Sequence, residues 1–280
     1  MRPYLITLGA LLLCLLASCG GRQAAQTENE LSADSIQSAD TTAADTIADV
    51  LIETPMPKAA DELFDDFIFN FAASRKLQME RINFPLPVID GDDRELLRRG
   101  EWHTEHFFMQ QGFYTLLFDT EKSMEAVKDT TVQHVVVEKI LLEEDRVTQY
   151  VFDRIRGTWK MTSIRRIPVN ETVNASFLSF YHRFASDKEF QMESLTETVT
   201  FVGPDPDDDF SEMEGVITAD TWEAFAPELP SDLFYNITYG KNQEEGDSKV
   251  FVLRGIANGF ELQMTFKRKG DKWKLTKLIT

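Results

Sequence analysis

A long internal repeat constrains the fold of this chain more than any other feature of its 280 residues. The pattern Phe-x-x-Phe-x-x-x-Phe-Ala begins at Phe64 and begins again at Phe177, 113 residues further on. A second block, which contains a Trp-Lys pair, begins at Trp159 and returns at Trp273, 114 residues further on. Two blocks at nearly one separation indicate a duplicated unit. A unit this long predicts two tandem domains, because the units of solenoid proteins have only about 20–50 residues.

The middle of the repeat is less regular. Trp102 matches Trp222 at a separation of 120 residues, so the second copy gains about seven residues before this point. The additional residues fall in the Asp-rich segment 203–209, whose composition predicts a loop.

Each copy predicts helices followed by an antiparallel sheet. Phe64, Phe67, Ile68 and Phe71 are spaced i, i+3, i+4 and i+7, which places them on one helix face. The period then changes to two, which is typical of strands. The segments with this period are 132–138, 147–154, 158–164, 249–255, 259–268 and 272–279. Helices followed by an antiparallel meander predict the α+β class, with one face of each sheet packed on the long helix.

Serine residues mark the expected starts of the helices in the second copy. Ser176 is placed to cap the long helix, and Ser186 with Glu189 has the spacing of a capping box for the short one.

The N-terminus has the features of an export signal. Arg2 precedes the apolar run 5–16, and small residues follow before Cys19. The apolar run is shorter than the roughly 20 residues that a membrane-spanning helix needs. Leu-Ala-Ser-Cys at 16–19 resembles the lipobox of bacterial lipoproteins. That resemblance implies cleavage of the signal peptide 1–18 and lipid on Cys19, with Gly20 favouring the outer membrane. The alternative is an ordinary secretory signal with a chance cysteine.

Residues 19–58 are predicted to form a lipidated N-terminus and a disordered tether. They are rich in Ala, Ser, Thr and Asp and contain no aromatic residue, so they cannot bury enough apolar surface to fold. Ser35, Thr41 and Thr46 each follow an Asp, and these triplets resemble O-glycosylation sites of some envelope proteins. The alternative interpretation is composition bias alone.

Charge and cysteine content limit the possible partners. The formal net charge is −18 with no basic cluster, so nucleic acid is not an expected partner.

The chain has two cysteines. Cys14 would leave with the signal peptide and Cys19 would carry lipid, so the mature chain would have no disulfide and would depend on a packed core.

The order of elements resembles the NTF2-like, cystatin-related cone fold. The resemblance implies two tandem NTF2-like cone domains at 59–168 and 172–280, each a helix pair packed on a curved antiparallel sheet. The whole chain more closely resembles the family of bacterial lipoproteins known as domain of unknown function 4348. The lipobox, the polar tether, Phe-Pro-Leu-Pro at 84–87 and the duplicated Trp-Lys ending carry that resemblance. The family resemblance implies no activity.

Two clusters could bind a metal ion. His103 and His106 would share a face of a helix and could bind zinc with Glu105 or Glu101, although the spacing favours a solvated helix beside a core Trp. Asp205, Asp207 and Asp209 begin an acidic run that could bind calcium weakly. The glycine and the final Glu of a calcium-binding loop are missing from this run, which favours a solvated loop.

No arrangement of residues predicts catalysis. Tyr114, Tyr150, His134 and His182 are available to a cone interior, but their spacing pairs none of them with a carboxylate. We therefore assign no catalytic residue and no cofactor.

We expect a non-enzymatic binding or scaffolding module, anchored to the membrane by lipid, for a small apolar ligand, a glycan or an envelope protein. The alternative is a small-molecule isomerase or hydrolase that uses the cone pocket. A cavity filled by apolar side chains would favour binding, and an open one with convergent polar groups would favour catalysis.

Overall fold

The structure is a computed structural model that describes residues 61–205, 207–240 and 244–280, without the side chains of residues 209 and 210. These residues all belong to one unit, Thr42–Thr280. The predicted lipidation site and the three predicted glycosylation sites lie outside the described residues. No helix within the described ranges is long and apolar enough to cross a membrane.

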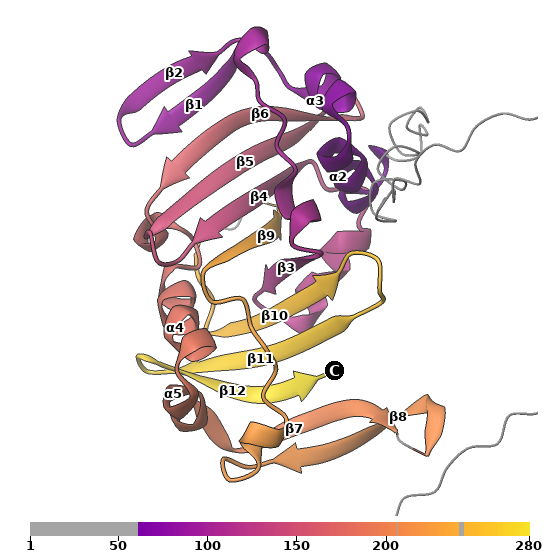
Figure 1. The fold of residues 1–280 in the computed structure, drawn as a ribbon, viewed down its shortest axis with the longest axis vertical. Coiled ribbons are helices and arrows are strands. Elements are labelled where there is room, and N and C mark those ends of the chain that lie inside the picture. Colours follow the sequence, from indigo (N-terminus) through magenta and orange to yellow (C-terminus); the bar gives the residue numbers. More distant parts are fainter. Residues whose placement is uncertain (1–60, 206, 241–243) are drawn as a thin grey trace, which may run out of the picture. The chain divides into compact units, whose positions relative to one another are not determined.

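The described residues form one mixed sheet of twelve strands with few helices, so the predicted α+β class is confirmed (Figure 1). The strands are β1 (Leu86–Asp90), β2 (Asp93–Leu97), β3 (Phe113–Phe118), β4 (His134–Leu141), β5 (Arg146–Ile155), β6 (Thr158–Ile167), β7 (Leu195–Asp205), β8 (Asp208–Ile217), β9 (Leu233–Tyr239), β10 (Ser248–Gly255), β11 (Glu261–Lys269) and β12 (Lys272–Ile279). The α-helices are α2 (Phe64–Ala73), α3 (Arg75–Arg81), α4 (Ala175–Ser186) and α5 (Lys188–Glu193).

The two halves of the chain exchange a strand. The order in the sheet is β2-β1-β6-β5-β4-β9-β3-β10-β11-β12-β7-β8, so β9 lies between β4 and β3, and β3 pairs with β10 (Figure 1). The strands β3 and β9 run parallel, with Thr115 opposite Asn236. Because one sheet includes strands of both halves, the division into two tandem domains stays a prediction.

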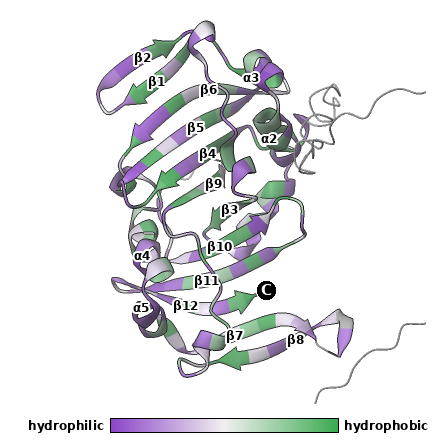
Figure 2. Ribbon diagram, viewed as in Figure 1, coloured by the Kyte–Doolittle hydropathy of each residue, from purple (hydrophilic) through white to green (hydrophobic). Residues whose placement is uncertain are grey.

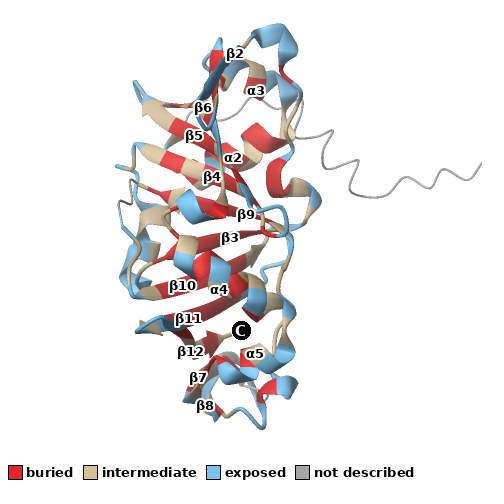
Figure 3. Cartoon of the chain, turned by 90° about the vertical axis from the view of Figure 1, so that its left-hand side faces the viewer, coloured by how far each residue is buried: buried red, intermediate tan, exposed pale blue. Residues whose placement is uncertain are grey.

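Apolar residues on both faces explain why β3 and β9 occupy the centre. On β3, Leu116 faces the core of the first half and Leu117 faces the core of the second. Strands buried on both faces require nearly continuous apolar sequence, and both of these strands are largely hydrophobic (Figure 2). Buried residues accordingly dominate β9, β3 and β10, whereas the edge strand β2 is mostly exposed (Figure 3). The two halves thus pack their cores on opposite faces of the shared central strands.

The aromatic contacts of the two halves correspond pair by pair. Phe71 and Phe184 lie in α2 and α4, and Trp159 and Trp273 lie in β6 and β12. Ring pairs of this kind each contribute about 0.5–1.5 kcal/mol beyond their buried area. The centroid separations are 5.0 Å for Phe64–Trp159 and 5.4 Å for Phe177–Trp273, and 5.3 Å for Phe71–Phe152 and 5.2 Å for Phe184–Phe266.

The helix caps differ from those predicted. Ser176 lies inside α4, where its Oγ accepts a hydrogen bond from Trp273 Nε1 at 3.0 Å. The cap of α5 is Asp187, whose carboxylate accepts the Phe190 N–H, instead of Ser186. The Asp187 carboxylate thus caps α5 in place of the Ser186 hydroxyl. The Ser176 hydroxyl bonds to a tryptophan of β12 instead of to its own helix terminus.

Candidate functional site

The interior of the first half is filled by ring side chains. The face of α2 predicted from the sequence packs against the sheet, and its phenylalanines contact rings from the strands and from the 3-10 helix η3 (Phe107–Gln110). The buried rings in this core are Phe64, Phe67, Phe71, Trp102, Phe107, Phe108, Tyr114, Phe118, Tyr150, Phe152, Trp159, Tyr235 and Tyr239. By the criterion set from the sequence, such filling favours binding over catalysis.

Glu105 and Asp65 each bring a carboxylate to tyrosine hydroxyls of this aromatic interior, and Glu105 accepts from two of them. Glu105 Oε2 accepts a hydrogen bond from the Tyr150 hydroxyl at 2.8 Å. Its Oε1 accepts one from the Tyr235 hydroxyl at 3.3 Å and one from the Phe107 N–H at 3.1 Å. Phe107 has a φ of +49°, a left-handed conformation that is uncommon for residues other than glycine. The hydrogen bond to Glu105 therefore holds a strained turn in place, and such strain is often found at functional sites.

Burial decides the protonation of the two phenols. Burial first, and then the Glu105 carboxylate, raise the pKa of both Tyr150 and Tyr235 well above the usual value for tyrosine. Both hydroxyls therefore remain protonated near neutral pH and act as hydrogen-bond donors to Glu105.

A buried glutamine positions the backbone of Glu105. Gln78 Nε2 donates to the Glu105 carbonyl at 2.7 Å, and Gln78 Oε1 accepts from the Trp102 Nε1 at 3.0 Å. The second half repeats this contact, since Trp222 Nε1 donates to Gln191 Oε1 at 3.1 Å. The scaffold around Glu105 is thus present in both halves.

An open cavity of about 450 Å³ lies beside this cluster. Four of its lining side chains belong to a row on the interior face of five adjacent strands, which we call the inner row. The inner row consists of Tyr235, Lys139, Thr148, Arg166 and Asp90. Tyr150, Leu141 and Arg146 complete the lining of the cavity.

The lining of the cavity carries three cations and one carboxylate, although the whole chain is strongly acidic. The Lys139 ammonium lies 5.8 Å from the ring centroid of Tyr235. Among the described residues, no carboxylate forms an ion pair with Lys139, whereas Arg166 contacts Asp90 at 3.5 Å and Arg146 contacts Glu144 at 2.5 Å. A cation that lacks a carboxylate partner can receive an anionic group from a ligand.

The second half has no equivalent of these charges. In the same register, Thr115 pairs with Leu253, and Leu253 pairs with Leu262. The counterpart of Glu105, at the spacing of the matched tryptophans, is Phe225. Two copies of one scaffold therefore differ in that only the first carries Glu105 and the cations of the inner row. This difference distinguishes a site from the framework that holds it.

The two histidines of the predicted zinc site do not share a helix face. His103 and His106 lie in an irregular segment instead of a helix, and His103 Nδ1 lies 3.3 Å from the Glu101 carbonyl. The neighbouring carboxylate of Glu105 points to the tyrosines instead. Within the described ranges, no group of three or more His, Cys, Asp or Glu residues could hold a metal ion.

The acidic run forms a hairpin instead of the predicted loop. Asp205 ends β7, and β8 begins at Asp208, so the run pairs across two strands. The Asp205 carboxylate accepts the N–H of Asp207 at 2.9 Å, which is a turn contact. The side chain of Asp209 lies outside the described residues. The seven-residue gain in the second copy thus lengthens two strands.

The structure pairs polar side chains that linear spacing could not pair. Tyr150 binds Glu105, and His134 Nδ1 lies 2.7 Å from an oxygen of Asp153 on the neighbouring strand. Burial raises the pKa of Tyr114 to about 12. His182 lies half-buried on α4. The cross-strand register creates the His134–Asp153 pair, and the fold of the irregular segment before η3 brings Glu105 to Tyr150.

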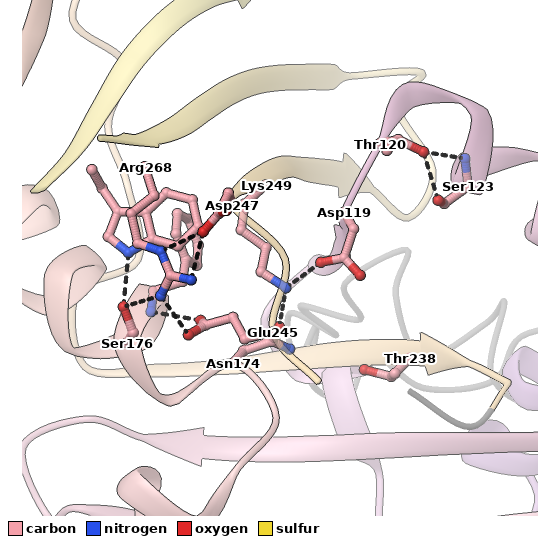
Figure 4. A network of polar contacts seen from close by, with 12 residues as sticks. Asp119, Thr120, Ser123, Asn174, Ser176, Thr238, Glu245, Asp247, Lys249 and Arg268 are labelled. Carbon is pink, nitrogen blue, oxygen red and sulfur yellow. Dashed lines mark hydrogen bonds and ion pairs between the residues drawn. The ribbon is translucent and has the colours of Figure 1, made fainter. Parts of the chain in front are cut away.

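A separate polar network ties the exchanged strand to the second half (Figure 4). Lys249 is fully buried, and its ammonium contacts Asp119 Oδ1 at 2.5 Å and Asn174 Oδ1 at 2.6 Å. Asp119 directly follows β3, and Asn174 precedes α4. Arg268 contacts Asp247 close by. The contacts join three segments from both halves, so this network has a structural role.

Comparisons with known proteins agree with the resemblance seen in the sequence. A family model described as "Domain of unknown function (DUF4348)" matches residues 43–280. The chain is similar to the crystal structure of an NTF2-like protein from Bacteroides fragilis NCTC 9343, with 41% sequence identity and a TM-score of 0.72. The match covers 80% of this chain and 98% of that chain. Among curated proteins, none matches. The fold is thus NTF2-like.

Proposed function

We propose that this chain, which belongs to the DUF4348 family of domains of unknown function, is a lipid-anchored envelope protein that binds a small anionic ligand without transforming it. The observation that carries the proposal is the inner row, where Lys139 has no carboxylate partner among the described residues and lies in an open cavity beside Tyr150 and Arg166. The ligand would present a carboxylate or phosphate to the cations and hydroxyl groups to Thr148.

The state of Glu105 supports binding over catalysis. Both of its oxygens already accept hydrogen bonds, from Tyr150, Tyr235 and the Phe107 N–H. A general base must be free to turn toward the proton of a substrate. Here the carboxylate is used to hold the two phenols in place, and the phenols themselves stay protonated.

The alternative function is an isomerase or hydrolase of small molecules. One observation favours it, namely that a carboxylate contacts a tyrosine at the edge of an aromatic interior. Under this hypothesis Glu105 would leave its tyrosine partners when substrate enters. Turnover of a test ester or steroid by the wild-type protein, abolished in Glu105→Gln, would replace the binding proposal.

The membrane anchor is part of the same proposal. Lipid on Cys19 and a polar tether over residues 19–58 would hold the folded part near the outer membrane. Cys19→Ala is expected to move the protein from the membrane fraction to the soluble fraction. Continued membrane association of this variant would contradict the anchor. Mass spectrometry of the mature protein would show whether Ser35, Thr41 or Thr46 carries a glycan.

We propose that residues 59–168 and 172–280 are two NTF2-like units that have exchanged the strands β3 and β9. The repeated ring contacts and the repeated Trp–Gln contact support this origin.

The binding test uses the soluble variant Cys19→Ala. Sugar acids, dicarboxylates and inorganic phosphate are screened by thermal shift at low and high salt, and positive compounds are measured by calorimetry. Lys139→Leu, which installs the residue found in the second half, is expected to weaken binding at least about tenfold, since a charged hydrogen bond is lost. Lys272→Leu makes the same change of charge at an exposed position of the second half and serves as the control. Equal binding by both variants would place the ligand elsewhere.

A further inference from the structure

The opposite face of the same strands carries a second cavity, of about 570 Å³. It lies between β4, β5, β6 and β9 and the connection that leads through the 3-10 helix η5 (Val169–Glu171) to α4. Glu138 and Arg165 both line it, together with His134, Thr238 and Asn174. None of these residues lines the cavity of the inner row.

Four polar side chains cross the sheet on this face, and we call them the outer row. The register places Asn236 opposite Glu138, Glu138 opposite Gln149, and Gln149 opposite Arg165. Each member immediately precedes or follows a member of the inner row along its strand, so the two rows point to opposite faces.

Glu138 is a buried carboxylate at one end of the cavity. Only 5% of the residue is exposed. Its Oε1 accepts from Gln149 Nε2 and its Oε2 from Asn236 Nδ2, both at 2.9 Å. Burial raises the pKa of Glu138, and the neutral donors Asn236, Gln149 and Thr238 offset only part of the loss of water around the charge. A cation from a ligand would offset it.

Arg165 stands on the other side of the cavity. It is exposed, and within the described ranges its guanidinium has no hydrogen-bond or ion-pair partner. Two strand spacings separate Arg165 from Glu138, which corresponds to about 10 Å. This backbone separation requires a ligand whose two charges lie farther apart than those of a free α-amino acid, as they do in a short peptide.

The second half again acts as an internal comparison. The equivalent row is Leu116, Val252, Gln263 and Ile279, with the same register. The glutamine is retained, whereas the acid and the arginine are replaced by aliphatic residues. The scaffold does not require either charge, so a role in folding does not account for them.

We propose that this cavity binds a small zwitterion, such as a dipeptide, with its ammonium group on Glu138 and its carboxylate on Arg165. The ammonium donates to the carboxylate that burial disfavours, and the guanidinium receives a bidentate partner. The site is independent of the inner row, so it extends the proposed function by a second ligand.

Calorimetry with the soluble Cys19→Ala protein tests the proposal with L-alanyl-L-alanine as the probe. One molecule is expected to bind per chain. The N-acetylated and the C-amidated forms of the dipeptide each lose one charge and are each expected to bind at least about tenfold more weakly. Absence of dipeptide binding to the wild type, or unchanged binding of either blocked form, would overturn the proposal.

Variants separate this site from the inner row. Glu138→Gln and Arg165→Gln are each expected to weaken dipeptide binding at least about tenfold. Arg94→Gln, at an exposed position of the edge strand β2 that lines neither cavity, is the matched control with unchanged binding. Loss of dipeptide binding in Arg166→Gln, with binding by Arg165→Gln unchanged, would show that the dipeptide occupies the inner row. Because Arg165 is exposed, its variant folds even if the Glu138 variant does not, and circular dichroism verifies this. Failure of small anions to bind at Lys139 would leave these results unaffected, so the two proposals are tested separately.

Discussion

Lys249 and Asp119 form an ion pair across the strand exchange, with Lys249 Nζ 2.5 Å from Asp119 Oδ1. The lysine is 1% exposed, whereas one third of the aspartate side chain is exposed. The position equivalent to Lys249 in the first half is Val135, which lies fully in the core. In the second half, a charged side chain therefore takes the place of an apolar core residue, and its ion pair with Asp119 holds the end of β3.

Replacing Lys249 with Val is expected to destabilise the fold by about 3 kcal/mol, at the low end for a broken buried pair, because Asp119 can still reach water. Urea unfolding measures this change. The double variant with Asp119→Asn is expected to recover part of the loss, since no charge is then left unpaired. A single variant as stable as the wild type would show that the pair contributes nothing to holding β3.

The strand exchange predicts one cooperative unfolding transition for the whole described region. Each half contributes a central strand to the sheet of the other, so neither half can unfold while the other keeps its neighbours. Phe71→Ala and Phe184→Ala are each expected to cost about 3–5 kcal/mol and to lower the same single transition in calorimetry. Two transitions, each lowered by only one of the variants, would mean that the halves are independent.

Glu138 predicts a dependence of stability on pH. Its pKa is raised in the folded state by burial, so the folded protein holds this proton more tightly than the unfolded chain. Below the pKa that Glu138 has in the unfolded chain, the stabilisation from this group is complete. It is lost as pH rises from there through the raised pKa of the folded state. His134, Arg165 and Glu171 line the same cavity and contribute their own charges.

The test compares the unfolding free energy of the wild type and Glu138→Gln between pH 4 and 8. The difference between them is expected to shift in favour of the variant as pH rises, because glutamine has no proton to lose. A constant difference over the range would contradict the raised pKa.

The tyrosines predict a late and cooperative alkaline transition. Burial raises the pKa of every tyrosine in the described residues, to about 12 for Tyr114 and further above the ordinary range for the other four. Because the unfolded phenols ionise near 10, stability falls as pH rises above about 10. Phenolate absorbance of the chain from residue 19 onward should therefore rise together with the loss of circular dichroism. A smooth titration near pH 10 in the folded protein would disprove it.

The local elements of this fold could be predicted from the sequence, because they depend on neighbours along the chain. The spacing of Phe64, Phe67 and Phe71 specifies a helix face, and the six segments with a period of two are all strands. The repeat itself predicted that Phe71 would correspond to Phe184 and Trp159 to Trp273, since duplicated sequence carries duplicated packing.

The order of the strands was decided only by the tertiary structure. The strands β3 and β9 are alike and both largely apolar. Their sequences therefore favour a position at the centre of the sheet but do not determine which strand each one pairs with. The candidate sites depend on that choice. Tyr235 reaches Glu105, and Asn236 reaches Glu138, only because β9 lies beside β4. A register between strands far apart in sequence is set by the sum of packing on two faces, and no local pattern records that sum.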